Sequence, residues 1–303
     1  ETIINPGVKD QEGLNDFQKV PDLFGIAIPK VGIERFRVPL MFKHLDGRIM
    51  NHDSEVSLYI SLTAGKTGVN MSRFCAILQD ASSDEHINGL FLKKILKRLQ
   101  DQMKDKPSDP EIENAYISIK FMYPIKQKSL KSNNWGWQYY PCEIKAHSKS
   151  KIQESMDLVL QYEYSSTCPC SLSMSKQYEL DYKEGKTTEG NGIGTAHSQR
   201  SKATITISHK NNISYSIEDL INLTKIAIPT ETQSLVKRPD EQAFAILNGE
   251  HPMFVEHAAR RISVALDSEE KILDWNVKIE HFESLHSHNA VAYIQKKLPN
   301  SFN

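Results

Sequence analysis

The sequence predicts an α+β protein in which one unit, with the element order β-β-α-α-β-β, occurs twice. Segments in which apolar and polar residues alternate predict half-buried strands, and segments with apolar residues three or four positions apart predict amphipathic helices. Both kinds of segment follow one another in the same order before and after the Lys/Ser-rich stretch His147–Lys151. We expect antiparallel sheets with a helix pair on one face of each, because a sheet with an apolar face must bury it against another layer.

The first half contains the first copy of this unit. Alternating segments predict strands at 33–40, 56–62, 117–123 and 137–144. A short helix is expected at 71–78, and a longer one is expected to begin at the capping box formed by Ser82 and Glu85. The apolar stripe of the longer helix consists of Ile87, Leu90, Phe91, Ile95 and Leu99. The polar segment 126–134 predicts a hairpin loop between the last two strands.

The second half repeats the order. Alternating segments predict strands at 156–164, 203–207, 273–279 and 290–294, and the Gly/Thr/Lys/Glu-rich segment 178–194 predicts an inserted loop between the first two. One helix is expected to begin at Ser216, with Asp219 three residues on, and another directly after Pro252, since proline is favoured at the first helical position. The apolar face of that last helix comprises Phe254, Val255, Ala258 and Ile262. We therefore predict an N-terminal module at 1–149, with an N-terminal extension, and a C-terminal module at 150–303.

Composition narrows the function classes. The chain has 303 residues, and its 37 Lys and Arg residues nearly cancel its 38 Asp and Glu residues, for a formal net charge of −1. A protein that coats nucleic acid or lies on a membrane surface needs an uncompensated positive field, so we expect neither kind of partner. No apolar run approaches the roughly 20 residues that span a bilayer, and residues 1–10 lack the pattern of a signal peptide. With four cysteines in the whole chain, we expect a globular protein of a reducing compartment, the cytoplasm.

Polar clusters at strand or helix ends of the second half are the candidates for chemistry. They are Thr167–Ser171, Gly194–Ser201, Lys237–Glu241 and His286–Asn289. Cys168 is expected to follow a strand and His197 to precede the next one, so that the hairpin brings the two together. With a carboxylate such as Glu241, a thiolate and an imidazole make a ligand set for a divalent metal that leaves a position for water. Such a metal lowers the pKa of its bound water to about 7.

Other interpretations of the same residues stay open. Cys168 and Cys170 are also compatible with ordinary small thiols beside a turn-forming proline, and Cys168 with a nucleophile activated by His197 or His286. Glu256 is either a helical carboxylate favoured near the N-terminus by the dipole or a two-oxygen acceptor for an N–H edge such as that of guanine.

Three basic residues and one histidine have similar double interpretations. Arg200, Lys237 and Arg238 are either solvated cations or ligands of phosphate groups. His281 lies in an alternating segment and is interpreted as a strand residue rather than a metal ligand.

Two nucleotide-binding motifs are incomplete or missing in the sequence. Gly65-Lys66-Thr67 resembles the end of a P-loop, but Ile60 stands where the motif requires its first glycine. No G-x-G-x-x-G sequence follows a predicted strand, so a Rossmann cofactor domain has no support.

Seven motifs, in order along nearly the whole chain, resemble those of the GTP cyclohydrolase type IB family. They are Ala27–Ile33, Met71–Phe74, Cys168–Ser171, Ala196–Ser201, Leu235–Glu241, Phe254–Glu256 and Phe282–Ala290. The resemblance implies two tandem tunnelling-fold (T-fold) modules per chain, each ββααββ, and a homotetramer with active sites at subunit interfaces. It also implies GTP as the substrate and one divalent metal, zinc, manganese or iron, in each active site.

The resemblance also implies roles for single residues. Cys168, His197 and Glu241 take the positions of the metal ligands, and Cys168 is in addition implied to be catalytic. Glu256 is similar to the glutamate that anchors guanine. Two departures concern this site: the interval between Cys168 and His197 is longer than expected, and Gly68-Val69-Asn70 stands where a Gly-Thr-His-like triplet is more usual.

The remaining implied roles concern charge and protons. Arg200, Lys237 and Arg238 would neutralise the triphosphate. His286, paired with His288, is similar to an active-site histidine that protonates a ring nitrogen and shuttles protons.

The implied reaction is the hydrolysis of GTP at C8 to 7,8-dihydroneopterin triphosphate and formate, the first step of folate or pterin biosynthesis. A first alternative is a T-fold nitrile reductase, similar to 7-cyano-7-deazaguanine reductase, with Cys168 as covalent nucleophile and NADPH as reductant. A second is a purine- or pterin-binding module without chemistry, which would bind through Glu256. A chelator should abolish the hydrolysis and leave the reductase unaffected.

Overall fold

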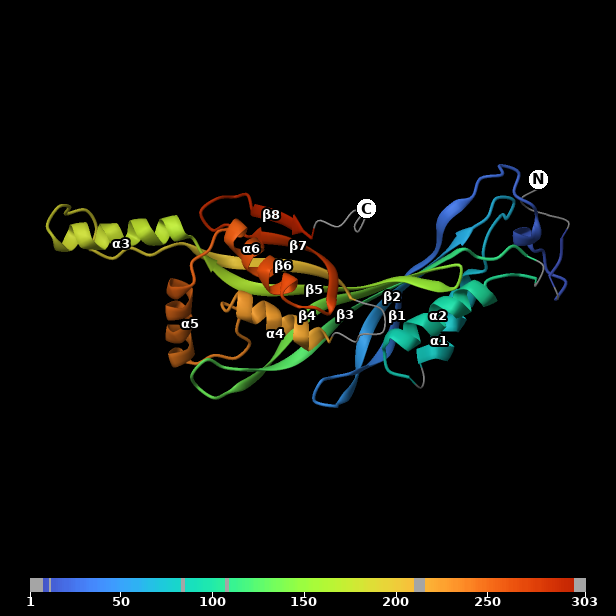
Figure 1. The fold of residues 1–303 in the computed structure, drawn as a ribbon, viewed down its shortest axis with the longest axis horizontal. Coiled ribbons are helices and arrows are strands. Elements are labelled where there is room, and N and C mark those ends of the chain that lie inside the picture. The colour runs from blue at the N-terminus through green and yellow to red at the C-terminus, as the bar shows by residue number, and fades with distance from the viewer. Residues whose placement is uncertain (1–7, 11, 83–84, 107–108, 210–215, 297–303) are drawn as a thin grey trace. The chain divides into compact units, whose positions relative to one another are not determined.

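The computed structural model describes residues 8–10, 12–82, 85–106, 109–209 and 216–296 (Figure 1). A 3-10 helix, η1 (Phe17–Lys19), precedes the first strand. The elements of the first half are β1 (Ile28–Lys43), β2 (Ile49–Leu62), α1 (Met71–Ser82), α2 (Gly89–Gln102), β3 (Asn114–Lys128) and β4 (Trp135–Lys149). Those of the second half are β5 (Ile152–Thr167), α3 (Pro169–Lys183), β6 (Ser198–His209), α4 (Ile217–Ala227), α5 (Arg238–Glu250), α6 (Val255–Asp267), β7 (Ile272–His281) and β8 (Ala290–Gln295).

The strands form one eight-stranded sheet in which each strand is hydrogen-bonded to its neighbours in the chain. The pairing is antiparallel, with Val56 opposite Ile119 and Ile205 opposite Val277. The predicted α+β class is therefore confirmed, with an antiparallel sheet and six α-helices in the described part of the chain. None of the helices within the described ranges is long and apolar enough to cross a membrane.

Two compact units divide the chain. The first consists of Glu1–Phe121 and Glu143–Asp157, and the second of Met122–Cys142 and Leu158–Asn303. The tip of the hairpin formed by β3 and β4 thus belongs with the second unit. The predicted module boundary after residue 149 is defined by the repeat in the sequence, which these compact units do not test, and it stays a prediction.

The core of the first unit follows from the alternation on β2. Its even-numbered residues from His52 to Leu62 are buried, while the residues between them are exposed or half-buried. The strand therefore has one apolar face to cover, and α1 packs against β1 and α2 beside it (Figure 1). The side chains that fill this core include Val56, Leu58, Ile60, Phe74, Leu78, Phe91, Ile95 and Leu99.

The helix α2 begins later than predicted. Its N-cap is Asn88, whose side-chain oxygen accepts from the Phe91 N–H at 2.9 Å. The predicted start at Ser82 is wrong, because Ser82 closes α1; residues 83–84, inside the predicted capping box, lie outside the described residues. With the helix starting at Gly89, Leu90 is 79% exposed and does not belong to the buried stripe.

The second unit has its core between its strands and the pair α4 and α6. The two helices contact each other, and α6 packs on β7 and β8. The predicted helix start at Ser216 is confirmed: its hydroxyl accepts from the Asp219 N–H at 2.9 Å, and the Asp219 carboxylate accepts from the Ser216 N–H at 3.4 Å. The buried side chains include Leu160, Tyr162, Ala203, Ile205, Leu220, Ile221, Ala258, Ile262, Val277 and Ile279.

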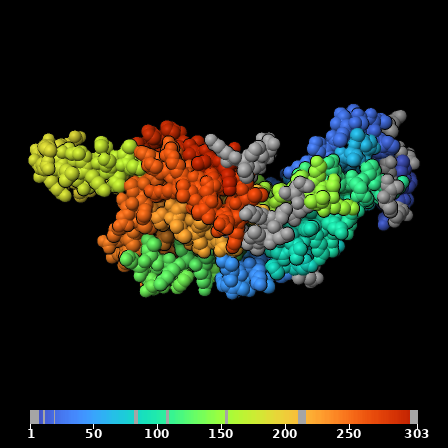
Figure 2. Space-filling view, in the orientation of Figure 1, coloured from blue at the N-terminus to red at the C-terminus, as the bar shows by residue number. Residues whose placement is uncertain are grey.

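Two helices of the second unit differ from the prediction. The segment 178–194 is not entirely a loop, because α3 continues to Lys183. This helix and its return segment stand out from the second unit as an arm (Figure 2), and no α3 residue is buried. It therefore lacks the apolar stripe by which periodicity reveals a helix. The other, α5, lies in a segment for which no helix was predicted.

The start of α6 also lies later than predicted. The helix begins at Val255, and Phe254 is its N-cap, so Pro252 does not occupy the first helical position. Phe254 is 37% exposed rather than part of the buried face. The other predicted face residues, Val255, Ala258 and Ile262, are buried.

Candidate functional site

Cys168 lies where β5 gives way to a helix. It is the N-cap of α3, with an extended backbone, and Pro169 opens the helix. The Cys168 N–H donates to the carbonyl of His197 at 3.2 Å. The predicted approach of the two hairpin ends is therefore confirmed at the backbone. The Cys168 side chain is half-buried, and that of Cys170 is exposed.

The ring of His197 is held from one side. Its Nδ1 lies 3.0 Å from Oε1 of Gln199 and 3.8 Å from Oε2 of Glu283. The backbone N–H of His197 donates to Oγ of Ser171, in the first turn of α3, at 3.2 Å. Among the described residues none makes a hydrogen bond to Nε2 of His197. This nitrogen is therefore the one available to a ligand.

Buried polar side chains fill the space between β5 and β6 beside this pair. Oγ of Ser166 accepts from Nε2 of Gln199 at 2.8 Å and lies 2.8 Å from Oγ of Ser201. Ser166 and Ser201 are fully buried, and Gln199 is 8% exposed. Gln199 and Ser201 belong to the predicted cluster Gly194–Ser201 but had no predicted role of their own, and Ser166 lies outside the predicted clusters. The available signal is that polar residues occupy inward positions on two otherwise apolar strands.

The end of β7 lies beside the start of β6. The Phe282 N–H donates to the Arg200 carbonyl at 3.1 Å, while the Arg200 side chain is exposed. His281 is buried in β7, as predicted for a strand residue, with Nε2 3.0 Å from the Tyr164 hydroxyl. Burial lowers the pKa of His281 to about 4, against the opposing effect of Glu256 in the first turn of α6. That interaction places Glu256 near the same end of the strands.

The two predicted catalytic histidines lie in the loop between β7 and β8. The rings of His286 and His288 are stacked, with centroids 4.9 Å apart and planes 10° from parallel, and both residues are exposed. Within the described part of the chain, no hydrogen bond or ion pair joins either ring to Cys168 or His197, so the stacked pair faces solvent in a single chain.

The first turn of α5 is anchored by Asp240, a residue not predicted to have a role. Its buried carboxylate accepts from the N–H groups of Lys131 at 2.7 Å, Ser132 at 2.9 Å and Lys237 at 2.8 Å, and from the Ser132 hydroxyl. Burial alone would raise the pKa of Asp240, but these hydrogen bonds outweigh it and hold the pKa well below its usual range. The anchor leaves Lys237, Arg238 and Glu241 exposed.

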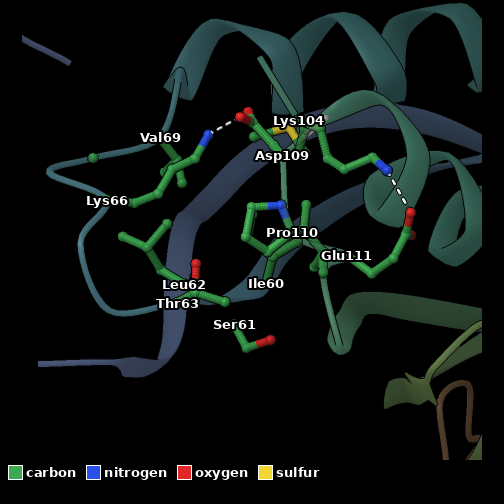
Figure 3. Close-up of a pocket in the computed structure, with 13 residues that line it drawn as sticks. Ile60, Ser61, Leu62, Thr63, Lys66, Val69, Lys104, Asp109, Pro110 and Glu111 are labelled. Carbon is green, nitrogen blue, oxygen red and sulfur yellow. Dashed lines mark hydrogen bonds and ion pairs between the residues drawn. The ribbon is translucent and has the colours of Figure 1, made fainter. Parts of the chain in front are cut away.

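Two hollows lie in the first unit, away from all of these residues. One, of about 20 Å³, has room for about one water molecule. At its rim Nζ of Lys66 is paired with Asp109 at 2.6 Å (Figure 3), so the lysine of the incomplete P-loop motif has a structural partner. The other, of about 600 Å³, is lined by residues of both charges, among them Lys30, Glu34 and Tyr59. Neither contains a predicted site residue.

Comparison with known proteins decides the family. The model of the type I GTP cyclohydrolase FolE2 family matches residues 14–292. The chain belongs to this family. It is 38% identical over 268 residues to GTP cyclohydrolase FolE2 of Cereibacter sphaeroides, an alignment that covers 88% of this chain and 70% of the relative. It is also 38% identical to the FolE2 of Ruegeria pomeroyi, over 93% of this chain and 74% of the relative.

The solved structures similar to this FolE2 chain include uricases. The uricase of Arthrobacter globiformis matches with a TM-score of 0.51 and 9% identity over 90% of this chain and 95% of that chain. The uricase of Bacillus fastidious matches with a TM-score of 0.51 and 8% identity, over 89% and 92% of the two chains. At such low identity the likeness concerns the fold alone.

The donor atoms predicted for the FolE2 metal have suitable chemistry. Thiolate sulfur, imidazole nitrogen and carboxylate oxygen are all ligands of divalent metals such as zinc. The structure brings Cys168 and His197 together, and His197 has Nε2 available. Across the described ranges, however, no three His, Cys, Asp or Glu side chains form a group that could hold an ion.

The position of Glu241 explains the missing third donor. The helix α5 reaches the end of β5 through its C-terminal part, where Asn248 Oδ1 accepts from the Thr167 hydroxyl at 3.4 Å. Glu241 lies seven residues earlier on the same helix, which is about 10 Å along the axis. The backbones of Cys168 and His197 therefore meet in one chain, whereas Glu241 lies about two helical turns before the α5 residue that contacts Thr167.

Proposed function

We propose that this FolE2 chain is a metal-dependent GTP cyclohydrolase that converts GTP, by hydrolysis at C8, to 7,8-dihydroneopterin triphosphate and formate. This reaction is the first step of folate or pterin biosynthesis. The observation that carries the proposal is the family match over residues 14–292, with relatives named GTP cyclohydrolase at 38% identity. The adjacency of Cys168 and His197 supports a site at the junction of β5 and β6.

Cys168, His197 and Glu241 are the proposed ligands of one divalent metal, which is zinc, manganese or iron. When bound, such a metal activates water near neutral pH and polarises the reacting group. Cys168 and His197 supply two donors from neighbouring strand ends, so their relative position is set by the backbone hydrogen bond between them. The separation of Glu241 from this pair supports a site that is completed when chains assemble.

Glu256 is the proposed anchor for guanine. Its two carboxylate oxygens can accept together from the N1–H and N2–H groups of the base, a charge-assisted pair of hydrogen bonds. Adenine does not offer this pair of donors, so the contact selects guanine. The exposed position of Glu256 in the first turn of α6 leaves both oxygens accessible.

The exposed basic and imidazole groups have the remaining proposed roles. Arg200, Lys237 and Arg238 neutralise the triphosphate. His286 and His288 hold and move protons, because an imidazole changes its charge near neutral pH. All five are exposed in the single chain, which supports access by a charged substrate.

We infer the same assembly that the family resemblance implies, a homotetramer with active sites at subunit interfaces. The inferred building blocks are tandem T-fold modules at 1–149 and 150–303. The order β1-β2-α1-α2-β3-β4 supports the first module, and the second half has the same order when α3 and α5 are treated as insertions. The four unpaired cysteines support a reducing compartment, the cytoplasm.

The test combines metal analysis and turnover on one preparation. The purified, metal-loaded protein should release formate from GTP and yield a pterin that becomes fluorescent on oxidation. EDTA should abolish the reaction, and so should Cys168→Ala, while the control Cys75→Ala in α1 should leave it intact. A folded, metal-bearing protein that releases neither product would overturn the proposal. Chelator-resistant, NADPH-dependent reduction of a nitrile would instead establish the reductase alternative.

A further inference from the structure

We propose that Gln199 is a positioning residue that holds His197 as the tautomer with the proton on Nδ1, so that the Nε2 lone pair is presented to the metal. The inference rests on the proposed function for the metal role of His197. The tautomer itself is independent of the proposed function, because hydrogen bonds within the chain determine it. Its starting observation is the 3.0 Å contact between Nδ1 of His197 and Oε1 of Gln199.

The hydrogen bonds around Gln199 run in one direction. The Ser201 hydroxyl donates to the backbone carbonyl of Gln199 at 3.5 Å. A hydroxyl has one proton, so the 2.8 Å contact between Ser201 and Ser166 uses the proton of Ser166. Oγ of Ser166 then acts as the acceptor for Nε2 of Gln199 at 2.8 Å. The three bonds form a closed ring that runs in one direction, from the side-chain amide of Gln199 through Ser166 and Ser201 to the backbone carbonyl of Gln199.

This ring fixes the orientation of the Gln199 amide. With the NH2 group directed at Ser166, the oxygen Oε1 is the atom that faces His197. An amide oxygen only accepts, so the imidazole Nδ1 must be the donor. In a neutral imidazole the other nitrogen then carries the lone pair. That nitrogen, Nε2, has no hydrogen-bond partner among the described residues.

Burial makes the orientation hard to reverse. Ser166 and Ser201 are fully buried and Gln199 is 8% exposed, so water cannot readily replace a broken bond. Leaving a buried donor or acceptor unsatisfied costs about 1–3 kcal/mol. Flipping the amide would set its NH2 group against the imidazole and its oxygen against Ser166. The Ser166 proton would then turn to Gln199 and the Ser201 proton to Ser166, so the bond from Ser201 to the backbone carbonyl of Gln199 would be lost. The amide is therefore held in one orientation before any ligand arrives.

The charged group nearest the ring favours the same tautomer. Oε2 of Glu283 lies 3.8 Å from Nδ1 of His197, on the side already facing Gln199. A carboxylate there stabilises a proton on Nδ1 and leaves Nε2 on the opposite side of the ring. Metal-binding histidines commonly use such a partner on the second nitrogen, and loss of the partner typically costs about 10- to 100-fold in metal affinity.

The test reads the tautomer and the metal affinity without GTP. Wild type with ¹⁵N-labelled histidine, metal-free at pH 8, should show a protonated Nδ1 and an unprotonated Nε2 for His197. Gln199→Met, which keeps the size but removes donor and acceptor, should raise the population of the other tautomer. It should also weaken zinc binding, measured by competition with a chromophoric chelator, by about 10- to 100-fold. Gln199→Glu keeps an acceptor on Nδ1 and should retain near-wild-type affinity.

Two outcomes would overturn the inference: wild type with the proton on Nε2, or Gln199→Met with unchanged ring shifts and unchanged zinc affinity. Should Gln199→Met fail to fold, Ser166→Ala replaces it in the test. This variant removes the hydrogen bond that orients the Gln199 amide, so its histidine ring shifts should also show more of the other tautomer. Failure of the proposed function has a different signature, because zinc affinity would then be insensitive to Cys168→Ala. In that case the ring shifts still decide whether Gln199 sets the tautomer of His197.

Discussion

At the residue scale, the ionisable side chains fall into two environments. Glu256, Arg200 and Lys237 are exposed, where a charged ligand can reach them. His52 and His281 are buried, and burial lowers the pKa of each to about 4. The exposed groups are suited to binding a polar substrate, whereas the buried ones tie the stability of the fold to pH.

The substitution Glu256→Gln tests the guanine contact. It replaces one acceptor with a donor that faces the N–H edge of the base, which should cost about 3 kcal/mol and lower kcat/KM for GTP about 100-fold. Inosine triphosphate lacks the N2 amino group, so the preference for GTP over it should shrink in the variant. The control Glu250→Gln, at the exposed end of α5, should behave as wild type. An unchanged preference between the two substrates would contradict the proposed role.

The pH dependence of stability should depend on His52. Burial, followed by the charge of His44, lowers the pKa of His52 to about 4, and Nε2 of His44 lies 3.1 Å from that of His52. A histidine in the unfolded chain has a pKa near 6.5, so acid protonates the unfolded state first. The contribution to stability is therefore full above about pH 6.5 and falls toward pH 4, by about 2 kcal/mol at pH 5.

Urea unfolding at pH 7 and pH 5 measures this effect. The difference in unfolding free energy between the two pH values should be smaller by about 2 kcal/mol in His52→Gln than in wild type. His281 affects the stability in the same direction, so part of the pH dependence of stability remains in both proteins. The same slope in variant and wild type would show that His52 is not linked to folding.

At the element scale, α5 and α3 are held by side-chain contacts rather than by an apolar face. The helix α5 is tied at its start to the hairpin loop between β3 and β4 through Asp240. The helix α3 has no buried residue, and isolated helices of about its length are marginal in water. Its return segment is fastened by Tyr178, which donates to the Glu189 carbonyl at 2.6 Å and accepts from the Gly192 N–H at 3.0 Å.

Replacing the Asp240 carboxylate should destabilise the second unit. Asp240→Ala removes a buried carboxylate that accepts four hydrogen bonds, at a cost on the order of 3 kcal/mol. Thermal or urea unfolding would measure the loss. Gln242→Ala, on the exposed side of the same helix, should stay within about 0.5 kcal/mol of wild type. Equal stability of the two variants would mean that the carboxylate does not anchor α5.

Removing one hydroxyl should loosen the arm without unfolding the unit. In Tyr178→Phe, both hydrogen bonds that the Tyr178 hydroxyl makes to the return segment are lost, so amide exchange over residues 184–196 should become faster. The melting temperature should hardly change, because no α3 residue belongs to the core. Lys176→Ala, an exposed position of the same helix, serves as the control. Unchanged exchange in Tyr178→Phe would show that other contacts hold the arm.

At the scale of the whole molecule, the near-zero net charge of −1 does not describe the proposed site. The cations proposed to bind phosphate lie at the start of α5 and on β6, within the second unit. Local rather than net charge therefore governs how a triphosphate would be attracted. The proposed ligand Glu241 and the proposed proton-transfer residues His286 and His288 are exposed in one chain, and no three-donor group forms among the described residues, as expected of a site completed by assembly.

Dilution provides a test of this assembly. Specific activity per chain should fall on dilution in step with dissociation of the tetramer, followed by analytical ultracentrifugation over the same concentrations. The metal content of the dissociated chain should fall as well, because two donors hold an ion more weakly than three. Full activity in a preparation shown to be monomeric would contradict an interfacial site.

The amino-acid sequence is sufficient to locate the elements that carry a regular apolar pattern. Alternation located all eight strands, since it reports directly on which face of a strand is buried. The sequence also predicted the capped start of α4 at Ser216, because capping depends on residues a few positions apart. It also determined the candidate donors Cys168 and His197, which lie at strand ends that a hairpin must bring together.

Features that depend on contacts between distant residues became visible only in the folded chain. The helix α3 buries no side chain and so has no periodic signature in the sequence. The helix α5 does have a local signal, because Pro239 and the acidic Asp240 mark its start. The distance of Glu241 from the other donors depends on how α5 is anchored to residues 131 and 132. The tautomer of His197 depends on Ser166, which lies 33 residues before Gln199 in the chain. Such hydrogen bonds leave no local pattern, because they form only when the strands have packed.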